Sequence, residues 1–386
     1  MIRYGQQDIT QDDIDSVVQT LRSVNLTQGP QITQFEDKLA NFIGAKHAYA
    51  VNSATSGLHI ACMALELGPG DILWTSPNTF VASANCALYC GASVDFVDID
   101  PLTYNMSVKK LSDKLINASK NGSLPKIVIP VHFAGQPCDM KAIHELSIKY
   151  NFKIIEDASH AVGASYRDSY IGSCKYSDIA VFSFHPVKII TTGEGGMAVT
   201  NCEKLAKKLS LFRSHGITRN SLDLEYDDIG PWYYEQLELG YNYRMTDIQA
   251  SLGISQLDRL EDFIVKRHEV AKFYNKNLAG LPLTLPFQSI EGVSSYHLYV
   301  IKLNLEEINV THREVFEFLR SKEILVNIHY IPVHTQPFYR NLGFSNGDFP
   351  EAENYYRHAI SIPMHPSLTD KDLDYVVKTL KEILDK

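Results

Sequence analysis

The feature that most constrains this chain is an alternation of short β-rich runs with helical patterns across residues 46–201. The β-rich runs read HAYAVNS, ILWTSPN, VDFVDID, KIVIPVHF and FKIIEDAS, and helical patterns separate them. Alternation of this kind is typical of a mainly parallel sheet covered by helices. Two more strand patterns, DIAVFSFH and GGMAVTN, follow without a helix between them. They predict either a hairpin or an antiparallel edge on the same sheet.

The remainder of the chain has a different order of elements. Apolar residues at helical spacing predict one long helix over about 246–279, from a Thr246-Asp247 cap to a stop at Gly280. Beyond it come a strand (SSYHLYVIKLN), a helix (THREVFEFLRSKE), a strand (LVNIHYIPV) and a final helix from Thr369. This order predicts a smaller α+β domain.

The length of 386 residues also favours two domains, because single cores stop growing beyond about 250–300 residues. We place a large α/β domain at residues 1–250 and the small domain at 251–386, with the long helix linking them. An acidic, aromatic stretch at residues 221–236 is interpreted as an insertion rather than a linker.

The net charge and the N-terminal residues restrict the binding partners and the location that we expect for this protein. A net charge of −9 opposes attraction to nucleic acid or to an anionic membrane. The opening MIRYGQQDITQDD has no basic segment followed by an apolar one, and no apolar run approaches about 18 residues. We therefore expect a cytoplasmic protein that neither binds nucleic acid nor spans a membrane.

Several common sites are missing from the sequence. It has no GxGxxG after the first strand, no GxxxxGK[ST], no GxSxG and no HExxH, which weighs against dinucleotide, P-loop, hydrolase and zincin chemistry. The cysteines show no zinc spacing, so we expect them to be reduced and buried, with no metal site. They are Cys62, Cys86, Cys90, Cys138, Cys174 and Cys202.

Polar residues at strand ends are the candidates for chemistry. In VFSFHPVKIITTGEGG, Lys188 follows a strand; it is either a solvated loop lysine or a Schiff-base lysine whose pKa is lowered by desolvation. In IIEDASHAVGA, Asp157 ends an apolar strand, where parallel sheets bind ligands. It could cap the next helix, or keep a pyridine nitrogen protonated.

The segment NSATSGLH adds a third signal. Thr55, Ser56 and Gly57 lie at the start of a helix, where backbone N–H groups and hydroxyls can bind an anion such as phosphate. The signal is weak alone, because Ser and Thr cap many helices. Three such signals on the strand ends of one parallel sheet are jointly much stronger.

These motifs resemble the DegT/DnrJ/EryC1/StrS family of pyridoxal phosphate-dependent sugar aminotransferases. The resemblance covers nearly the whole chain, through YGQQDI, LTQGPQITQFE, NSATSGLH, SPNTFVASAN, DIDPLTYN, PVHFAGQPCDM, EDASHAVGA, FSFHPVKIITTGEGG, LFRSHGI, GYNYRMTDIQASLGISQL and HYIPVH. It implies fold type I, as in aspartate aminotransferase, with a mainly parallel sheet and a smaller C-terminal domain. It also implies pyridoxal 5′-phosphate as the cofactor and a homodimer.

The resemblance assigns roles at the cofactor. Lys188 would form the Schiff base and Asp157 would pair with the pyridinium nitrogen. Phe80 would stack on the ring, although it could instead be a core aromatic, and His160 would lie beside the ring hydroxyl. The phosphate would be held by Thr55, Ser56, Ser183 and, from the neighbouring subunit, Asn242.

The resemblance also implies a substrate side. The candidate residues are Tyr4, Thr27, Gln28, Ser53, His185, Arg244, His329 and Tyr330. For His185, Arg244, His329 and Tyr330, structural roles weigh about equally. Arg244 is the preferred diphosphate ligand, because a guanidinium binds phosphate oxygens in a bidentate way.

Within the family, YGQQDITQDDID, LTQGP, FSFHPVK and NIHYIPVH are most similar to transaminases of pseudaminic acid synthesis. The implied reaction moves the amino group of glutamate to C4 of a UDP-linked 4-keto-6-deoxy-N-acetylhexosamine, in two ping-pong stages. Lys188 argues against the dehydratases of this fold, which place histidine there. Two alternatives stay open: the substrate is another nucleotide-linked keto-sugar, or the chain is a cofactor-binding regulatory protein without turnover. A nicotinamide-dependent reductase would need a glycine fingerprint.

Overall fold

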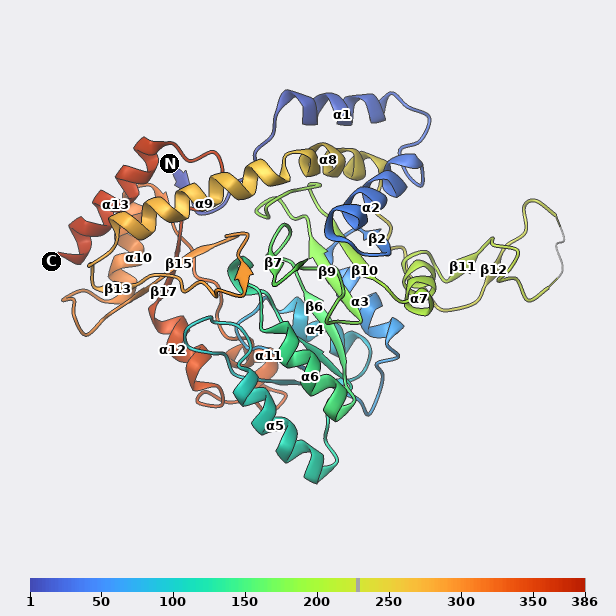
Figure 1. Cartoon of the computed structure of the whole chain (residues 1–386), viewed down its shortest axis with the longest axis horizontal. Coiled ribbons are helices and arrows are strands. Elements are labelled where there is room, and N and C mark those ends of the chain that lie inside the picture. The colour runs from blue at the N-terminus through green and yellow to red at the C-terminus, as the bar shows by residue number, and fades with distance from the viewer. Residues whose placement is uncertain (227–229, 386) are drawn as a thin grey trace.

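A seven-stranded sheet forms the centre of the computed structural model, which describes residues 1–226 and 230–385 (Figure 1). β10 is antiparallel to both of its neighbours, and the other neighbouring strands are parallel. The predicted mainly parallel α/β sheet is therefore confirmed. In spatial order the strands are β2 (His47–Val51), β10 (Gly196–Thr200), β9 (Ile179–Ser183), β6 (Lys153–Asp157), β5 (Ile127–Ile129), β3 (Ile72–Thr75) and β4 (Ser93–Phe96).

The antiparallel pair lies within this sheet. β9 and β10 pair antiparallel, as expected both for a hairpin and for an antiparallel edge of the sheet. The edge position was wrong, because β10 lies between β9 and β2, and β2 forms the edge.

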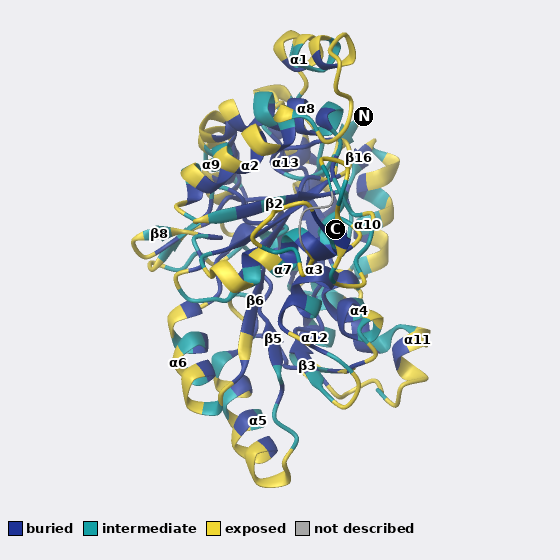
Figure 2. Cartoon of the chain, turned by 90° about the vertical axis from the view of Figure 1, so that its right-hand side faces the viewer, coloured by how far each residue is buried: buried dark blue, intermediate teal, exposed yellow. Residues whose placement is uncertain are grey.

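Helices cover both faces of the sheet, and Figure 2 shows that their outer sides are exposed while the strands are buried. They are α3 (Ala54–Ala64), α4 (Ala82–Tyr89), α5 (Val108–Asn121), α6 (Met140–Tyr150) and α7 (Glu203–Arg213). α5 shows how the sequence specifies such a helix. Ser107 caps its start by accepting a hydrogen bond from the Lys110 N–H, Leu111 and Leu115 are buried, and Gly122 ends it at a φ of 68°.

The predicted single helix over 246–279 is wrong. The structure has two helices, α8 (Asp247–Asp258) and α9 (Leu260–Asn277), which meet at Arg259 with φ −105° and ψ 7°. The predicted start is confirmed, since Thr246 accepts a hydrogen bond from the Gln249 N–H. At the break, Arg259 donates hydrogen bonds to the carboxylates of Asp8 and Asp13, which fastens the N-terminal segment.

The N-terminal segment packs beside these helices. It contains β1 (Ile2–Arg3), α1 (Gln11–Leu21) and α2 (Pro30–Ile43). α1 and α2 both contact α8, and Figure 1 shows α1 at the outer side of the molecule. Asp247 accepts hydrogen bonds from the backbone N–H groups of Gly29 and Gln31, which joins the start of α2 to the start of α8.

The C-terminal part has the predicted α+β character. Its antiparallel sheet contains β13 (Leu283–Thr284), β15 (Tyr299–Leu303) and β17 (Ala359–Ile362). Its helices are α10 (His312–Ser321), α11 (Pro337–Arg340), α12 (Pro350–His358) and α13 (Asp370–Leu384). The division at residue 250 stays a prediction.

The strand predicted for LVNIHYIPV is mostly wrong. Only β16 (Ile324–Leu325) forms, paired with β1, and His329 and Tyr330 lie in irregular backbone. The reason is that this segment forms contacts other than a ladder. The Tyr330 N–H donates to Asn78 Oδ1, and Asn327 makes an isolated bridge to Ser361.

Short elements complete the described chain. They are the 3-10 turns η1 (Phe133–Gly135) and η2 (Val333–Thr335), and the strands β7 (Ser165–Tyr166), β8 (Ser169–Tyr170), β11 (Ile217–Thr218), β12 (Glu235–Gln236) and β14 (Gly292–Val293). β11 and β12 form a hairpin that projects from the body (Figure 1). It includes the 221–236 stretch, of which residues 227–229 lie outside the described residues.

Three further sequence expectations concern cysteines, metals and membranes. All six cysteines are free, but Cys202 is exposed and Cys90 is only partly buried, so the expectation of burial was wrong for these two. Within residues 1–226 and 230–385, no group of three His, Cys, Asp or Glu side chains could hold a metal ion. None of the described helices is long and apolar enough to cross a membrane.

Candidate active site

The ends of three neighbouring strands bring the main candidates to one edge of the sheet. Asp157 ends β6 and Ser183 ends β9, and these two strands are parallel. Gly196 begins β10, directly opposite both Ser183 and Val51, the last residue of β2. Because the carboxyl ends of parallel strands share one edge, the loops after β2, β6 and β9 meet there.

Asp157 is buried, with 4% of its surface exposed, and both carboxylate oxygens are engaged. The Ser83 hydroxyl donates to Oδ2 at 2.6 Å, and the Ser159 N–H donates to Oδ1 at 3.1 Å. Residues 158–164 form turns rather than a helix, so the interpretation of Asp157 as a helix cap is wrong. A carboxylate held by two donors at a strand end is suited to accept a hydrogen bond from a cationic ring nitrogen.

Lys188 lies in the loop after β9. It is near the Asp157 carboxylate and is followed by buried apolar residues. Burial lowers the pKa of its amine to about 8, and the nearby Asp157 carboxylate opposes that shift. Lys188 is only partly exposed, so it is not a freely solvated loop lysine, whose pKa would stay near 10.4. An amine with a pKa of about 8 has a substantial free-base fraction near neutral pH, as a nucleophile or a general base requires.

His160 is held from both ring nitrogens. Its Nδ1 accepts a hydrogen bond from the Ala134 N–H at 3.2 Å, and its Nε2 lies 3.1 Å from the Tyr330 hydroxyl oxygen. Since Nδ1 accepts, the proton of the neutral ring is on Nε2. Burial, and after it the positive charge of Lys188, lowers the pKa of His160 well below its usual value. The imidazole therefore acts as a neutral donor.

Aromatic side chains line the same region. The Phe80 ring is 59% exposed and lies 6.3 Å from the Tyr330 ring, so the interpretation of Phe80 as a core aromatic is wrong. The Tyr4 ring lies 5.1 Å from the buried His329 ring. Burial lowers the pKa of His329 to about 3, with a smaller contribution from Lys188. An exposed ring beside a lysine and a carboxylate can stack on a planar ligand.

The start of α3 forms a polar group beside this cluster. Ser53 caps the helix by accepting from the Ser56 N–H, and the Ser56 hydroxyl donates to Asn52 Oδ1 at 2.6 Å. Thr55 lies in the same first turn and is partly exposed. Gly196 lets the sheet approach this turn, because a Cβ at that position would lie 2.6 Å from the Ala54 nitrogen. A helix start of this kind can bind an anionic group.

Other predicted residues stay apart from the Lys188 cluster within this chain. Asn242 is exposed, and only its backbone carbonyl contacts the α3 start, through the Asn52 amide at 3.5 Å. Arg244 forms a backbone bridge with Val51, and its guanidinium has no hydrogen bond or ion pair in the described part of the chain. Thr27 and Gln28 are exposed beside the start of α8. His185 is exposed, 3.9 Å from a Glu194 oxygen.

Sequence reasoning missed two residues of the site. Ser83 lies in the SPNTFVASAN block, and its hydroxyl oxygen lies 2.8 Å from the Thr79 hydroxyl while it donates to Asp157. Its spacing after Phe80 was the available signal. His297 has its ring 4.3 Å from the His160 ring, although the two residues are far apart in sequence. No local pattern marks it.

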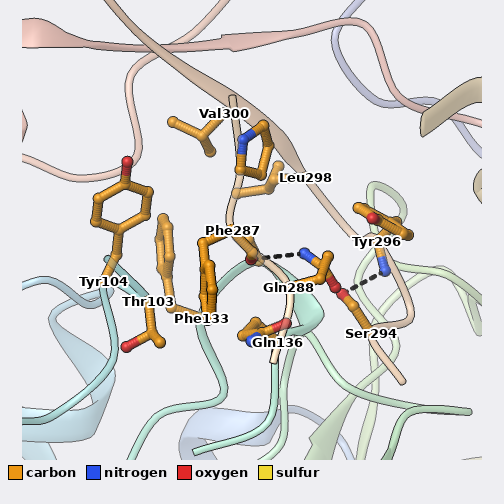
Figure 3. A pocket seen from close by; sticks show the side chains of 12 residues that line it. Thr103, Tyr104, Phe133, Gln136, Phe287, Gln288, Ser294, Tyr296, Leu298 and Val300 are labelled. Atoms are coloured by element: carbon orange, nitrogen blue, oxygen red, sulfur yellow. Dashed lines mark hydrogen bonds between the residues drawn. The ribbon is translucent and has the colours of Figure 1, made fainter. Parts of the chain in front are cut away.

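A separate pocket lies behind the η1 turn, between loops 286–288 and 294–300 (Figure 3). Tyr104 and Phe133 form part of its wall, and Gln136 lines it with an amide that has no hydrogen-bond partner among the described residues. Its volume of about 20 Å³ suffices for about one water molecule. Neither Lys188 nor Asp157 lines it, so it is not the candidate active site.

The chemistry of the Lys188 cluster fits one cofactor. An amine of lowered pKa, a buried carboxylate, an exposed aromatic ring and a helix start are the groups that a pyridine aldehyde with a phosphate requires. Together with the seven-stranded sheet they define a pyridoxal 5′-phosphate-dependent enzyme of fold type I. The model of the DegT/DnrJ/EryC1/StrS aminotransferase family matches residues 7–381. The chain belongs to this family.

Individual relatives agree with that membership. The chain is 40% identical over 388 residues to the UDP-4-amino-4,6-dideoxy-N-acetyl-beta-L-altrosamine transaminase of Campylobacter jejuni, covering 100% of this chain and 98% of the relative. Its structure is similar to Helicobacter pylori PseC, an aminotransferase involved in the biosynthesis of pseudoaminic acid, with a TM-score of 0.91 and 31% identity. That match covers 100% of this chain and 99% of the other.

A third comparison concerns the cofactor. A Streptococcus pneumoniae protein described as a sugar aminotransferase, in its PLP form, matches with a TM-score of 0.89 and 30% identity. The alignment covers 100% of this chain and 98% of that one. This chain is accordingly a sugar aminotransferase, and pyridoxal 5′-phosphate is its cofactor.

Proposed function

We propose that this enzyme transfers the amino group of glutamate to C4 of a UDP-linked 4-keto-6-deoxy-N-acetylhexosamine, in the pathway to pseudaminic acid. The observation that carries the catalytic part is the Lys188 amine, with its pKa of about 8, beside the buried Asp157 carboxylate. The similarity to the Campylobacter jejuni transaminase over the full length of both chains supports the substrate. We propose the cytoplasm as the site of the reaction.

Each cofactor-binding residue has a separate role in this proposal. Bound pyridoxal phosphate supplies an electron sink for the carbon that loses a proton. Asp157 would accept a hydrogen bond from the ring nitrogen and keep it protonated, with Ser83 orienting the carboxylate. Phe80 would cover one face of the ring, and His160 would donate from Nε2 to the ring hydroxyl. Lys188 would hold the cofactor covalently in the resting enzyme.

The phosphate belongs at the start of α3. Thr55 and Ser56 present hydroxyls in the first turn, and Ser183 lies at the end of the neighbouring β9. Asn242 is exposed on its own subunit, so we propose that its side chain reaches the phosphate of a second subunit in a homodimer. The dimer would then complete both sites.

Lys188 moves the proton in each half-reaction. In the first half, its free-base Nζ would take the proton from Cα of glutamate and pass it on, water would release 2-oxoglutarate, and the amino group would stay with the cofactor. In the second half, the same amine returns a proton to C4 of the sugar. A pKa of about 8 suits both steps, because the amine can then be protonated and deprotonated near neutral pH.

The sugar nucleotide would lie on the side of the cluster that faces His329 and Tyr330. Tyr4 packs against His329, and Ser53 lies at the adjoining helix start. Thr27, Gln28 and His185 are exposed and available to a large substrate. We assign the diphosphate to Arg244, because its guanidinium is not otherwise bound among the described residues and a pyrophosphate needs a cation.

Arg244→Ala tests this assignment by separating the two half-reactions. Losing one charged hydrogen-bonding contact should weaken reaction with the UDP-keto-sugar by about 10- to 100-fold. The glutamate half-reaction should change by less than about twofold, since glutamate carries no diphosphate. Single-turnover absorbance of the cofactor measures both. Arg219→Ala, on the β11–β12 hairpin, is the matched control. Equal losses in both half-reactions would contradict the assignment.

A further inference from the structure

A buried arginine binds the segment next to His160 and has no carboxylate partner among the described residues. Arg267 on α9 is 1% exposed. Its Nη1 donates to the carbonyl oxygens of Tyr296 at 3.0 Å, His297 at 3.3 Å and Met364 at 3.0 Å. No salt bridge to Arg267 occurs within residues 1–226 and 230–385, and its Nε has no hydrogen-bond partner there. Burying a cation without an anion is costly, so the protein retains it against a folding penalty.

The carbonyls that Arg267 binds belong to a segment, residues 294–298, that also contacts the η1 turn. The Ser295 N–H donates to the Gly135 carbonyl at 3.2 Å, and the Leu298 N–H donates to the Ala134 carbonyl at 3.3 Å. The η1 turn and the 294–298 segment approach each other so closely that position 135 requires glycine. Gly135 has a φ of 93°, and a Cβ there would lie 2.5 Å from Ser295 Oγ.

The η1 turn in turn fixes the His160 ring. The Ala134 N–H donates to His160 Nδ1, and the Ser295 hydroxyl donates to the His160 carbonyl at 2.8 Å. The His297 ring, from the same 294–298 segment, packs against the His160 ring. A continuous set of contacts therefore runs from Arg267 through this segment and the η1 turn to Nδ1 and the ring of His160.

We propose that Arg267 and His297 are positioning residues of the active site, which hold the 294–298 segment and the η1 turn so that His160 presents its Nε2–H toward Tyr330 and the cofactor hydroxyl. This inference rests on the role given to His160 under Proposed function. Arg267 acts through the backbone, because its Nη1 donates to three carbonyl oxygens of the chain. His297 acts by packing on the ring that donates.

The charges in this region agree with the proposal. Burial lowers the pKa of His297 well below its usual value, and the nearby cations Lys188 and Arg267 lower it further. Burial also lowers the pKa of Arg267, to about 10, which leaves it protonated at neutral pH. The permanent cation therefore disfavours a second positive charge on His297, and both imidazoles stay neutral.

Arg267→Met tests the inference, because methionine keeps an apolar volume and removes the charge and the donors. The first readout is the His160 tautomer by ¹⁵N NMR of the cofactor-free protein, which needs no activity. The second is the pH at which the visible band of the bound cofactor changes. We expect the Nε2–H tautomer to lose its dominance, the spectroscopic pKa to move by about half a unit or more, and kcat to fall about tenfold with KM within about twofold.

Two variants separate positioning from stability. Arg259→Met removes another partly buried guanidinium, which binds the carboxylates of Asp8 and Asp13 rather than the 294–298 segment. It should lower the melting temperature without changing the tautomer or the spectrum. Arg267→Lys keeps the charge and should restore part of the visible titration.

If Arg267→Met does not fold, Ser295→Ala replaces it, since it removes only the bond to the His160 carbonyl and should produce the same changes at smaller amplitude. An unchanged tautomer and an unchanged visible titration in these variants, with lowered stability, would overturn the inference. Failure of turnover on UDP-keto-sugars would instead reject the substrate assignment, because the NMR readout does not depend on it.

Discussion

The two halves of the candidate active site differ in how the chain holds them. Asp157 and His160 are buried and hydrogen-bonded within the chain, and Lys188 beside them is only partly exposed. Around Asn242 and Arg244, side chains are exposed or partly exposed, and the described chain binds mainly their backbone. The first half is therefore completed by one chain. The second half presents groups that a second subunit and a large substrate can bind.

The largest expected effect is in the buried half, at Lys188. Lys188→Ala should still bind cofactor but should lower the rate of the glutamate half-reaction at least about a thousandfold, because it removes the amine that we propose moves the Cα proton. Stopped-flow absorbance measures this rate. Lys175→Ala, an exposed lysine paired with Asp168, is the control and should react normally. Normal turnover by Lys188→Ala without added amine would refute the assignment.

Asp157→Asn should lower the same rate by about a hundredfold or more, because asparagine keeps the shape and removes the charge that holds the ring proton. Cofactor binding should persist. Ser83→Ala removes the 2.6 Å hydrogen bond to Asp157 and should have a smaller effect of the same kind. A fully active Asp157→Asn enzyme with intact folding would show that the carboxylate serves structure alone.

The exposed half predicts complementation between subunits. Asn242→Ala and Lys188→Ala should each be poorly active alone. If Asn242 serves the partner's phosphate site, a mixed dimer has one site with both substitutions and one with neither. Random mixing should then restore about a quarter of the wild-type activity. No recovery in a mixture that has demonstrably exchanged subunits would place Asn242 in its own site, and a monomer with full activity would also contradict the dimer.

The smallest effect concerns stability in the buried half. The pKa of Lys188 is lowered from 10.5 to about 8, so unfolding takes up a proton between these values. The free energy of unfolding of the cofactor-free protein should therefore rise from pH 8 to pH 10.5 through this group. Lys188→Met should be more stable than wild type at pH 7 by about 1–3 kcal/mol, and this gain should fade above pH 10.

Urea denaturation of the cofactor-free proteins at both pH values measures the difference. Lys175→Met, at an exposed position, should show no gain. A Lys188→Met protein that is less stable than wild type at pH 7 would show that burial of the amine carries no such cost.

Sequence reasoning was most successful in the buried half. β6 and β9 are apolar runs that end at Asp157 and Ser183, so the hydrophobic pattern locates the strand ends, and parallel pairing then brings them together. It failed where long-range contacts decide the backbone. The apolar spacing of Leu257, Leu260 and Phe263 continues across Arg259, and the helix breaks there.

The contact between His297 and His160 lay beyond local sequence patterns for a related reason. His297 reaches His160 only because Arg267 and the η1 turn hold its segment, and no periodicity records such a contact. Similarly, the stretch with His329 and Tyr330 looks like a strand because it is rich in β-branched and aromatic residues. Its backbone instead bonds to Asn78 and Ser361.

The most direct test of the account is a pair of half-reactions followed by the absorbance of the cofactor. Glutamate should remove the visible band of the purified enzyme, and a UDP-linked 4-keto-6-deoxy-N-acetylhexosamine should restore it, whereas the same sugar linked to GDP should restore it poorly. Restoration by simple 2-oxo acids but by no UDP-keto-sugar would contradict the substrate assignment. A band that glutamate does not change would contradict the proposed donor.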